Sequence, residues 1–221
     1  MSAARVSSCL PGAWCLEQHM PPSSMLTTVG GPVPLNSRVG RHKQRYAETG
    51  ERLVAGCIPI KYPGPNPTAD TVQVMLISRG GKGWVFPKGG WEDDETVEAA
   101  AQRETVEEAG VRGSIEEPVG TFSFRSNKQE HQGNAHQGRC RAHMFVMRVA
   151  EELETWPEYS QRQRCWVPLA EASSKCMHQW MRDALDTWVA NKGWQLQLDA
   201  AAAAAQQRQL HGSENGSLSS S

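Results

Sequence analysis

Long apolar runs are missing from this sequence of 221 residues, and so is an excess of charge of either sign. A bilayer-spanning helix needs about 20 consecutive apolar residues, and no segment approaches that length. The 23 Lys and Arg residues face 24 Asp and Glu residues, which leaves a net charge of −1. A generally basic nucleic-acid-binding protein carries a large positive excess instead. We therefore expect neither a membrane partner nor a nucleic-acid partner.

A cysteine framework is also lacking. None of the six cysteines forms a C-x-x-C pair, which excludes a zinc ribbon, and their irregular spacing argues against a secreted disulfide scaffold. We expect reduced thiols in an intracellular protein of the cytoplasm or nucleus.

Both ends of the chain lack an apolar pattern that could build a core. Residues 1–36 are rich in Pro, Gly and Ser and contain one acidic residue, Glu17. We expect a disordered leader there, with a transit peptide for a mitochondrion or chloroplast as the alternative. Residues 194–221 include six consecutive alanines and a Ser- and Gly-rich end, which predicts a disordered tail. The remaining residues, 37–193, have an ordinary length for one folded domain.

Hydrophobic periodicity predicts the main elements of that domain. Apolar runs rich in β-branched residues predict strands at residues 53–60, 72–78, 119–124 and 142–149. A helix is predicted from Thr96 to about Ala109, because acidic residues crowd its start and Gly110 stands where a left-handed C-cap belongs. A second amphipathic helix, over residues 177–189, should end near Gly193 and cover one face of the sheet.

The first of these helices carries three carboxylates on one flank. At about 100° per residue, Glu104, Glu107 and Glu108 share a side with Val97 and Ala101, which should face inward. Like charges at this spacing repel one another, and a hard divalent cation such as Mg²⁺ would neutralise them. The alternative for an isolated Glu-x-x-Glu-Glu is an acidic face exposed to water.

The wider spacing favours the metal site. The sequence resembles the Nudix box, G-x5-E-x7-R-E-U-x-E-E-x-G-U, in eight of its nine specified positions. The matching residues are Gly89, Glu95, Arg103, Glu104, Glu107, Glu108, Gly110 and Val111. Thr105 stands where an aliphatic residue is commonest. The resemblance implies an α/β fold, the Nudix α/β/α sandwich, with a mixed β-sheet and a loop-helix-loop motif that binds a divalent metal.

The resemblance also implies a role for the residues of the box. It makes Glu104 and Glu108 metal ligands, with the Gly89 carbonyl as a further ligand and Mg²⁺, or alternatively Mn²⁺, as the cofactor. Glu107 would be either a ligand or the group that activates water. Arg103 would orient a carboxylate, and an i, i+4 ion pair with Glu107 is compatible with that role. Metal ions would lower the pKa of the attacking water and neutralise the leaving phosphate, so no covalent nucleophile is needed.

Further stretches narrow the resemblance. Segments outside the box look like plant and algal Nudix proteins, and the stretches P-K-G-G (87–90) and A-Q-R-E-T (101–105) resemble fungal diphosphoinositol polyphosphate phosphohydrolase. This implies hydrolysis of phosphoanhydride bonds in diphosphoinositol polyphosphates and dinucleoside polyphosphates. The residues expected to bind such a polyphosphorylated small molecule are Lys88, Arg79, Arg38, Arg41, Lys43 and Arg45. The alternatives are a pyrophosphatase for another nucleoside diphosphate derivative and a non-catalytic Nudix module that binds such a ligand.

Overall fold

The structure is a computed structural model that describes residues 36–38, 42–78, 80–81, 83–126 and 138–214. All of these residues belong to one compact unit, Pro32–Ser221. The predicted leader lies outside the described residues except for Asn36, and so do Arg41, Arg79 and residues 215–221. Within the described part of the chain, no helix is long and apolar enough to cross a membrane.

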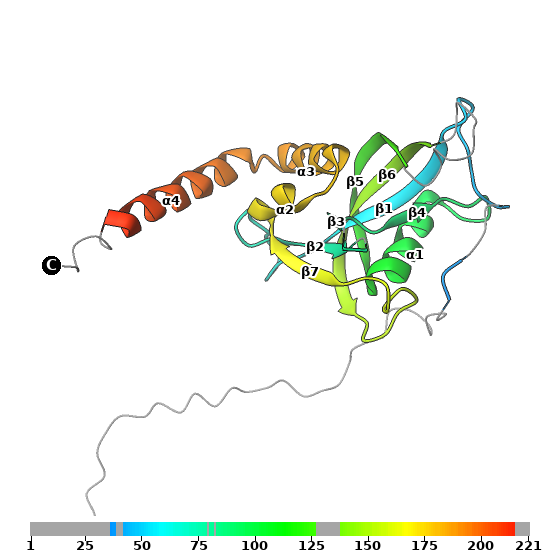
Figure 1. Cartoon of the computed structure of the whole chain (residues 1–221), viewed down its shortest axis with the longest axis horizontal. Helices are drawn as coiled ribbons and strands as arrows, with labels where there is room; N and C mark the ends of the chain where they lie inside the picture. Colours follow the sequence, from blue (N-terminus) through cyan, green and yellow to red (C-terminus); the bar gives the residue numbers. More distant parts are fainter. Residues whose placement is uncertain (1–35, 39–41, 79, 82, 127–137, 215–221) are drawn as a thin grey trace, which may run out of the picture. The chain divides into compact units, whose positions relative to one another are not determined.

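A mixed sheet of seven strands forms the centre of the described unit (Figure 1). Its strands are β1 (Arg52–Lys61), β2 (Gln73–Ser78), β3 (Trp84–Val85), β4 (Lys88–Gly90), β5 (Val111–Arg125), β6 (Arg139–Glu152) and β7 (Arg164–Pro168). The main path runs β3-β2-β1-β6-β5, while β4 pairs with β1 and β7 pairs with β2. The β1–β6 pair is parallel and the other pairs are antiparallel.

Helices cover both faces of this sheet. The helices that pack on it are α1 (Val97–Ala109), α2 (Leu169–Lys175) and α3 (Gln179–Lys192), and a further helix, α4 (Gln195–Glu214), follows α3 in the chain. Successive side chains of β1 point to opposite faces. Val54 and Ile58 join the larger core together with residues of α2 and α3, whereas Ala55 and Cys57 pack with Ala101 of α1. The predicted α/β/α sandwich with a mixed sheet is therefore confirmed.

The predicted strands and helices correspond to β1, β2, β5, β6, α1 and α3. Strand β5 begins at Val111, well before the predicted start at residue 119. Register shifts near Gly113, Glu117 and Pro118 interrupt the alternation that would have indicated the longer strand. The short strands β3 and β4, the strand β7 and the helix α2 were not predicted, because none of them spans enough residues to show a clear period.

The expectation of a disordered tail does not hold for residues 194–214. Trp194 is buried against Trp188, with ring centroids 5.4 Å apart, and α4 follows directly. The physical reason is that alanine is the best helix former, so the alanine run that suggested low complexity continues a helix. Leu198 packs against the larger core, and the side chain of Gln197 accepts a hydrogen bond from the Ala69 N–H at 3.1 Å.

Candidate functional site

Local interactions set both ends of α1. The Thr96 hydroxyl accepts a hydrogen bond from the Ala99 N–H, which caps the N-terminus. Gly110 ends the helix with φ 63°, and its N–H donates to the Val106 carbonyl at 3.0 Å. A Cβ on Gly110 would lie 2.4 Å from the Trp156 ring, so glycine also lets the β6–β7 loop pack against this end. The helix predicted from the sequence is confirmed, and its two fixed ends set where its carboxylates lie.

Thr105 explains how the box tolerates its one departure. The side chain is fully buried, and its hydroxyl donates to the Ala101 carbonyl one turn earlier at 2.7 Å. The polar group is thus satisfied inside its own helix, and the methyl group faces the core as an aliphatic side chain would.

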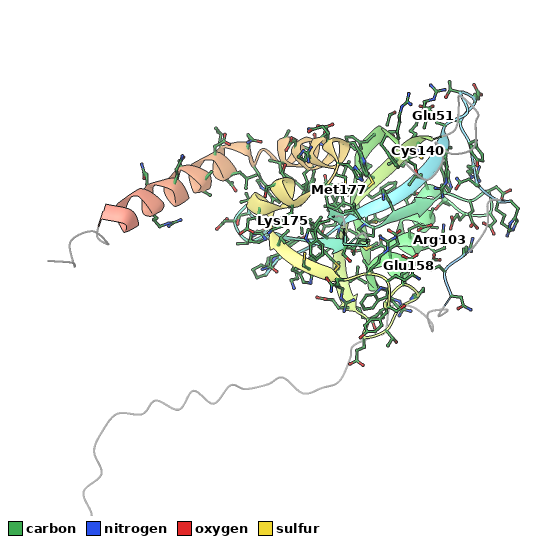
Figure 2. The ribbon with its side chains drawn as sticks, viewed as in Figure 1. Glu51, Arg103, Cys140, Glu158, Lys175 and Met177 are labelled. Carbon is green, nitrogen blue, oxygen red and sulfur yellow. The ribbon has the colours of Figure 1, made fainter. Side chains whose placement is uncertain are left out.

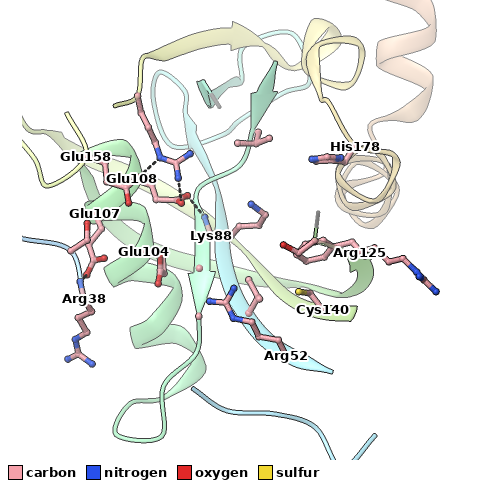
Figure 3. Close-up of a pocket in the computed structure, with 18 residues that line it drawn as sticks. Arg38, Arg52, Lys88, Glu104, Glu107, Glu108, Arg125, Cys140, Glu158 and His178 are labelled. Carbon is pink, nitrogen blue, oxygen red and sulfur yellow. Dashed lines mark hydrogen bonds and ion pairs between the residues drawn. The ribbon is translucent and has the colours of Figure 1, made fainter. Parts of the chain in front are cut away.

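A polar cleft of about 340 Å³ lies beside α1. In Figure 3, Glu104, Glu107, Glu108 and Glu158 lie on one side of it, while Arg125, Cys140 and His178 lie on the other. The remaining lining residues include Arg38, Arg52, Lys88, Gly89 and Arg162. One side of the cleft is therefore an acidic wall, formed by Glu104, Glu107, Glu108 and Glu158, and the opposite side has cationic and apolar groups.

Like Glu107, the carboxylates Glu104 and Glu108 of the acidic wall are largely buried. Burial raises the pKa of both groups above the ordinary range for glutamate, and the charge of Glu108 raises the pKa of Glu104 further. Glu108 accepts the Lys88 N–H at 2.9 Å and pairs with Arg162, while Glu104 pairs with Arg103 at 2.8 Å. These carboxylates are costly to charge until a cation compensates them.

Strand β4 approaches the carboxylates so closely that only glycine fits. A Cβ on Gly89 would lie 2.0 Å from an oxygen of Glu104. Within the described residues, no group of three His, Cys, Asp or Glu side chains is already gathered around a common point for a metal ion. The carboxylates are paired with arginines instead. Their oxygen chemistry, their proximity to a backbone segment and their need for a counter-charge all fit a hard divalent cation.

Arg103 connects the carboxylates to the loop before α1. Its Nη2 donates to Glu95 and to the Gly90 carbonyl, each at 2.8 Å. Its Nη1 contacts Glu104 at 2.8 Å and Glu107 at 3.4 Å, so the orienting role and the i, i+4 ion pair occur together. Figure 2 labels Arg103, which belongs to α1, and Glu158, whose N–H donates to the Glu107 carbonyl of the same helix.

The basic residues expected at the site separate into two groups. Lys88 and Arg38 line the cleft. Lys43 and Arg45 do not line it: Lys43 pairs with Asp94 at 2.8 Å, and Arg45 donates to the Glu92 carbonyl and lies over the Trp91 ring. Arg38 also pairs with Glu92 at 2.6 Å. Glu92 and Asp94 are therefore the ion-pair partners of this basic segment.

Sequence reasoning missed Glu158 and Arg162. Both belong to the loop between β6 and β7, and no motif marks them in the sequence. The Glu158 N–H donates to the Glu107 carbonyl at 3.1 Å, and Arg162 pairs with both Glu108 and Glu158. Only the return of the chain to the C-terminal end of α1 brings them to the acidic wall.

Comparison with known proteins gives the family. The NUDIX domain model matches residues 66–188. Nudix hydrolase 16, mitochondrial, of Arabidopsis thaliana is 48% identical over 157 residues, covering 68% of this chain and 86% of that protein. Diphosphoinositol polyphosphate phosphohydrolase 3-alpha of Mus musculus is 34% identical over 105 residues, covering 47% of this chain and 58% of that protein.

One further sequence and one solved structure are also similar to this chain. Nudix hydrolase 21, chloroplastic, of Arabidopsis thaliana is 43% identical over 177 residues, covering 77% of this chain and 85% of that protein. A crystal structure of a C. elegans Ap4A hydrolase binary complex has 19% sequence identity and a TM-score of 0.47, covering 64% of this chain and 97% of that one. Because the NUDIX domain model matches more than half of the chain and the plant hydrolases are over 40% identical to it, the chain belongs to the Nudix hydrolase family, whose members act on phosphoanhydrides and generally use divalent metals.

Proposed function

We propose that this Nudix hydrolase uses Mg²⁺ to cleave phosphoanhydride bonds in diphosphoinositol polyphosphates and dinucleoside polyphosphates. The observation that carries the proposal is the acidic wall, where Glu104, Glu107 and Glu108 meet the cleft beside Lys88. A binding module that never hydrolyses its ligand has no need to keep like charges on one partly buried helix face.

The residues of the wall have separable tasks in this proposal. Glu104 and Glu108 would hold the cation, with the Gly89 carbonyl as a further ligand, and Mg²⁺ when bound would neutralise phosphate charge and acidify water. Arg103 keeps Glu104 oriented, while Glu107 binds the cation or accepts the proton of the attacking water. Lys88 and Arg38 would bind phosphate oxygens of the substrate.

Two observations support the polyphosphate preference. It is supported by the named activity of the mouse relative and by the cationic residues of the cleft. Because Lys43 and Arg45 are engaged with the loop of residues 91–94, we restrict the phosphate-binding set to Lys88 and Arg38 among the described residues.

The catalytic test is a substrate screen of the purified full chain with and without Mg²⁺. Glu108→Gln should lower kcat by about 100-fold or more, as loss of a metal ligand usually does. Glu98→Gln is the matched control, because Glu98 is an exposed carboxylate on the same helix. A Glu108→Gln variant within about threefold of the wild type would contradict the proposal.

The specificity test compares a diphosphoinositol polyphosphate, diadenosine hexaphosphate and ADP-ribose by kcat/KM. The first two should be preferred, since each well-formed phosphate contact to a charged group adds binding energy. ADP-ribose as the best substrate would overturn the polyphosphate assignment and leave the hydrolase assignment intact. Binding without turnover of any of the three would favour the non-catalytic module.

We also propose an organelle as the site of action, with the cytoplasm as the alternative. The composition of residues 1–36 and the mitochondrial or chloroplastic designations of the plant relatives support this assignment. A fluorescent fusion to the C-terminus should enter an organelle, and removal of residues 1–36 should return it to the cytosol.

A further inference from the structure

A guanidinium group from the β6–β7 loop already occupies the acidic wall. The Nη2 of Arg162 pairs with Oε1 of Glu108, and its Nε pairs with Oε2 of Glu158. Its Nη1 reaches the Ser78 carbonyl at 3.5 Å. The side chain is only 18% exposed, so it is held in the site rather than lying loosely across it.

Both oxygens of Glu108 are in use in this arrangement. Oε1 pairs with Arg162, and Oε2 accepts the N–H of Lys88 at 2.9 Å. The Lys88 N–H belongs to β4, whose register with β1 pairs Lys88 with Gly56, so it has little freedom to move. A divalent cation that binds Glu108 through Oε1 would approach the guanidinium of Arg162 with like charge, so the two cations compete for this carboxylate.

Arg162 keeps a partner when it is displaced. Glu158 precedes it by four residues in the same loop and is 21% exposed, so the second ion pair can persist while the first is broken. The loop itself is anchored, because the Glu158 N–H donates to the Glu107 carbonyl and Trp156 packs on Gly110.

We propose that Arg162 is a displaceable counter-cation. It neutralises Glu108 when no divalent cation is bound, and the cation moves it toward Glu158, where its guanidinium faces the phosphates of the substrate in the cleft. The inference rests on the proposed function and deepens it. It makes Arg162 a positioning residue that links cation binding to recognition of an anionic substrate, and such a coupling acts in both directions.

The first experiment measures Mn²⁺ binding alone to the full chain by isothermal titration calorimetry. Arg162→Gln removes the competitor and should bind Mn²⁺ about tenfold more tightly, within the usual range for coupled sites. Arg112→Gln is the matched control, because it also removes an arginine from an ion pair, and neither Arg112 nor its partner Glu151 lines the cleft. Arg162→Lys, which keeps the charge, should lie nearer the wild type.

A double-mutant cycle tests the role of Glu158. Glu158→Gln removes the second partner of Arg162, so Arg162 should remain on Glu108 and Mn²⁺ binding should weaken. In the Arg162→Gln background the same substitution should change Mn²⁺ affinity by less than about twofold. A further loss of affinity in the double variant would show that Glu158 contacts the cation directly, and would overturn this part of the inference.

Steady-state kinetics with diadenosine hexaphosphate supply a signature that loosened packing would not produce. Arg162→Gln should combine tighter Mn²⁺ binding with a KM raised by about fivefold or more, because its guanidinium is missing from the metal-loaded cleft. A site damaged by misfolding would lose affinity for Mn²⁺ and for diadenosine hexaphosphate. If Glu108→Gln abolishes Mn²⁺ binding but Arg162→Gln binds Mn²⁺ no more tightly than the wild type, the inference about Arg162 is overturned and the proposed function stands. If Glu108→Gln binds Mn²⁺ as tightly as the wild type, the proposed function itself is overturned.

Discussion

Glu104 and Glu108 show how burial and charge are balanced at single residues. Both lie at a helix flank that also packs inward, and both have a pKa raised by desolvation. Glu104 pairs with Arg103, its neighbour on α1, and Glu108 pairs with Arg162 of the β6–β7 loop. Because these buried carboxylates are costly to charge even beside the arginines, the stability of the site depends on pH.

The first prediction concerns Glu104→Gln in the absence of divalent cations. Burial raises the folded-state pKa of Glu104 to about 8, above its ordinary value of 4.5, so the wild type loses stability as pH rises between these values. The Gln side chain of the variant carries no charge at either pH, so the variant does not lose stability in this way. The variant should be more stable than wild type by on the order of 2 kcal/mol at about pH 8, and by little at about pH 5.

Urea unfolding in a chelator at the two pH values measures this difference. Glu98→Gln, an exposed position on the same helix, should show no such pH-dependent gain. If Glu104→Gln is the less stable protein at about pH 8, then Arg103 stabilises the charged form of Glu104 more than burial disfavours it.

The second prediction separates two reasons for glycine at the helix ends. Gly110 and Gly193 both adopt the left-handed conformation, with φ 63° and 67°. A Cβ on Gly110 would meet Trp156 at 2.4 Å, whereas one on Gly193 would meet nothing within 4 Å. Gly193→Ala should cost about 1 kcal/mol, for the backbone alone, and Gly110→Ala about 3 kcal/mol because the clash is added. Equal losses in chemical denaturation would show that the Trp156 contact is unimportant.

At the scale of elements, α1 and the sheet edges follow different rules. Helix α1 is specified locally by Thr96, by its apolar positions and by Gly110, and its prediction was confirmed. Strand β4 has three residues and becomes a strand only because β1 offers it a partner through Gly89. The site depends on both, since β4 supplies the backbone against which the carboxylates of α1 are placed.

The third prediction concerns the start of α4. Removing residues 200–221 should leave the thermal midpoint within about 2 °C of wild type, because residues 201–204 and 206–208 of this helix are exposed. Trp194→Ala should cost about 3 kcal/mol, since the ring is buried against Trp188. Calorimetry of the two variants tests the expectation. A large loss in the truncated chain would mean that the outer part of α4 packs on the domain.

At the scale of the whole molecule, charge is nearly balanced and is separated only locally. The net charge of −1 cannot attract a strongly anionic substrate from a distance. Lys88 and Arg38 line the cleft, while Lys43 is paired with Asp94 outside it. Recognition of phosphate must therefore come from a few groups inside the cleft.

The fourth prediction follows from this distribution. Between about 0.05 and 0.5 M salt, kcat/KM for diadenosine hexaphosphate should fall, because exposed charges are screened over a few ångströms at high salt. Lys88→Ala should flatten this dependence, and Lys43→Ala should leave it unchanged. An equal effect of the two substitutions would mean that the segment around Lys43 also contacts the substrate.

The sequence by itself determined the family and the placement of the carboxylates on the helix. The spacing from Gly89 to Val111 is a local pattern, because helix caps, i, i+4 neighbours and a tight glycine all act within a few residues. That pattern predicted α1 and its three carboxylates. It also predicted that Arg103 would contact one of them, which the ion pair with Glu104 bears out structurally.

Tertiary structure decided which charges meet. The sequence predicted phosphate binding by Lys43 and Arg45 as well as by Lys88, but chain folding pairs the first two with the loop of residues 92–94 and leaves Lys88 in the cleft. Arg162 reaches Glu108 from 54 positions away, through a loop with no motif of its own. Partners this far apart are chosen by the packing of strands and loops, a property of the whole fold that no local spacing records.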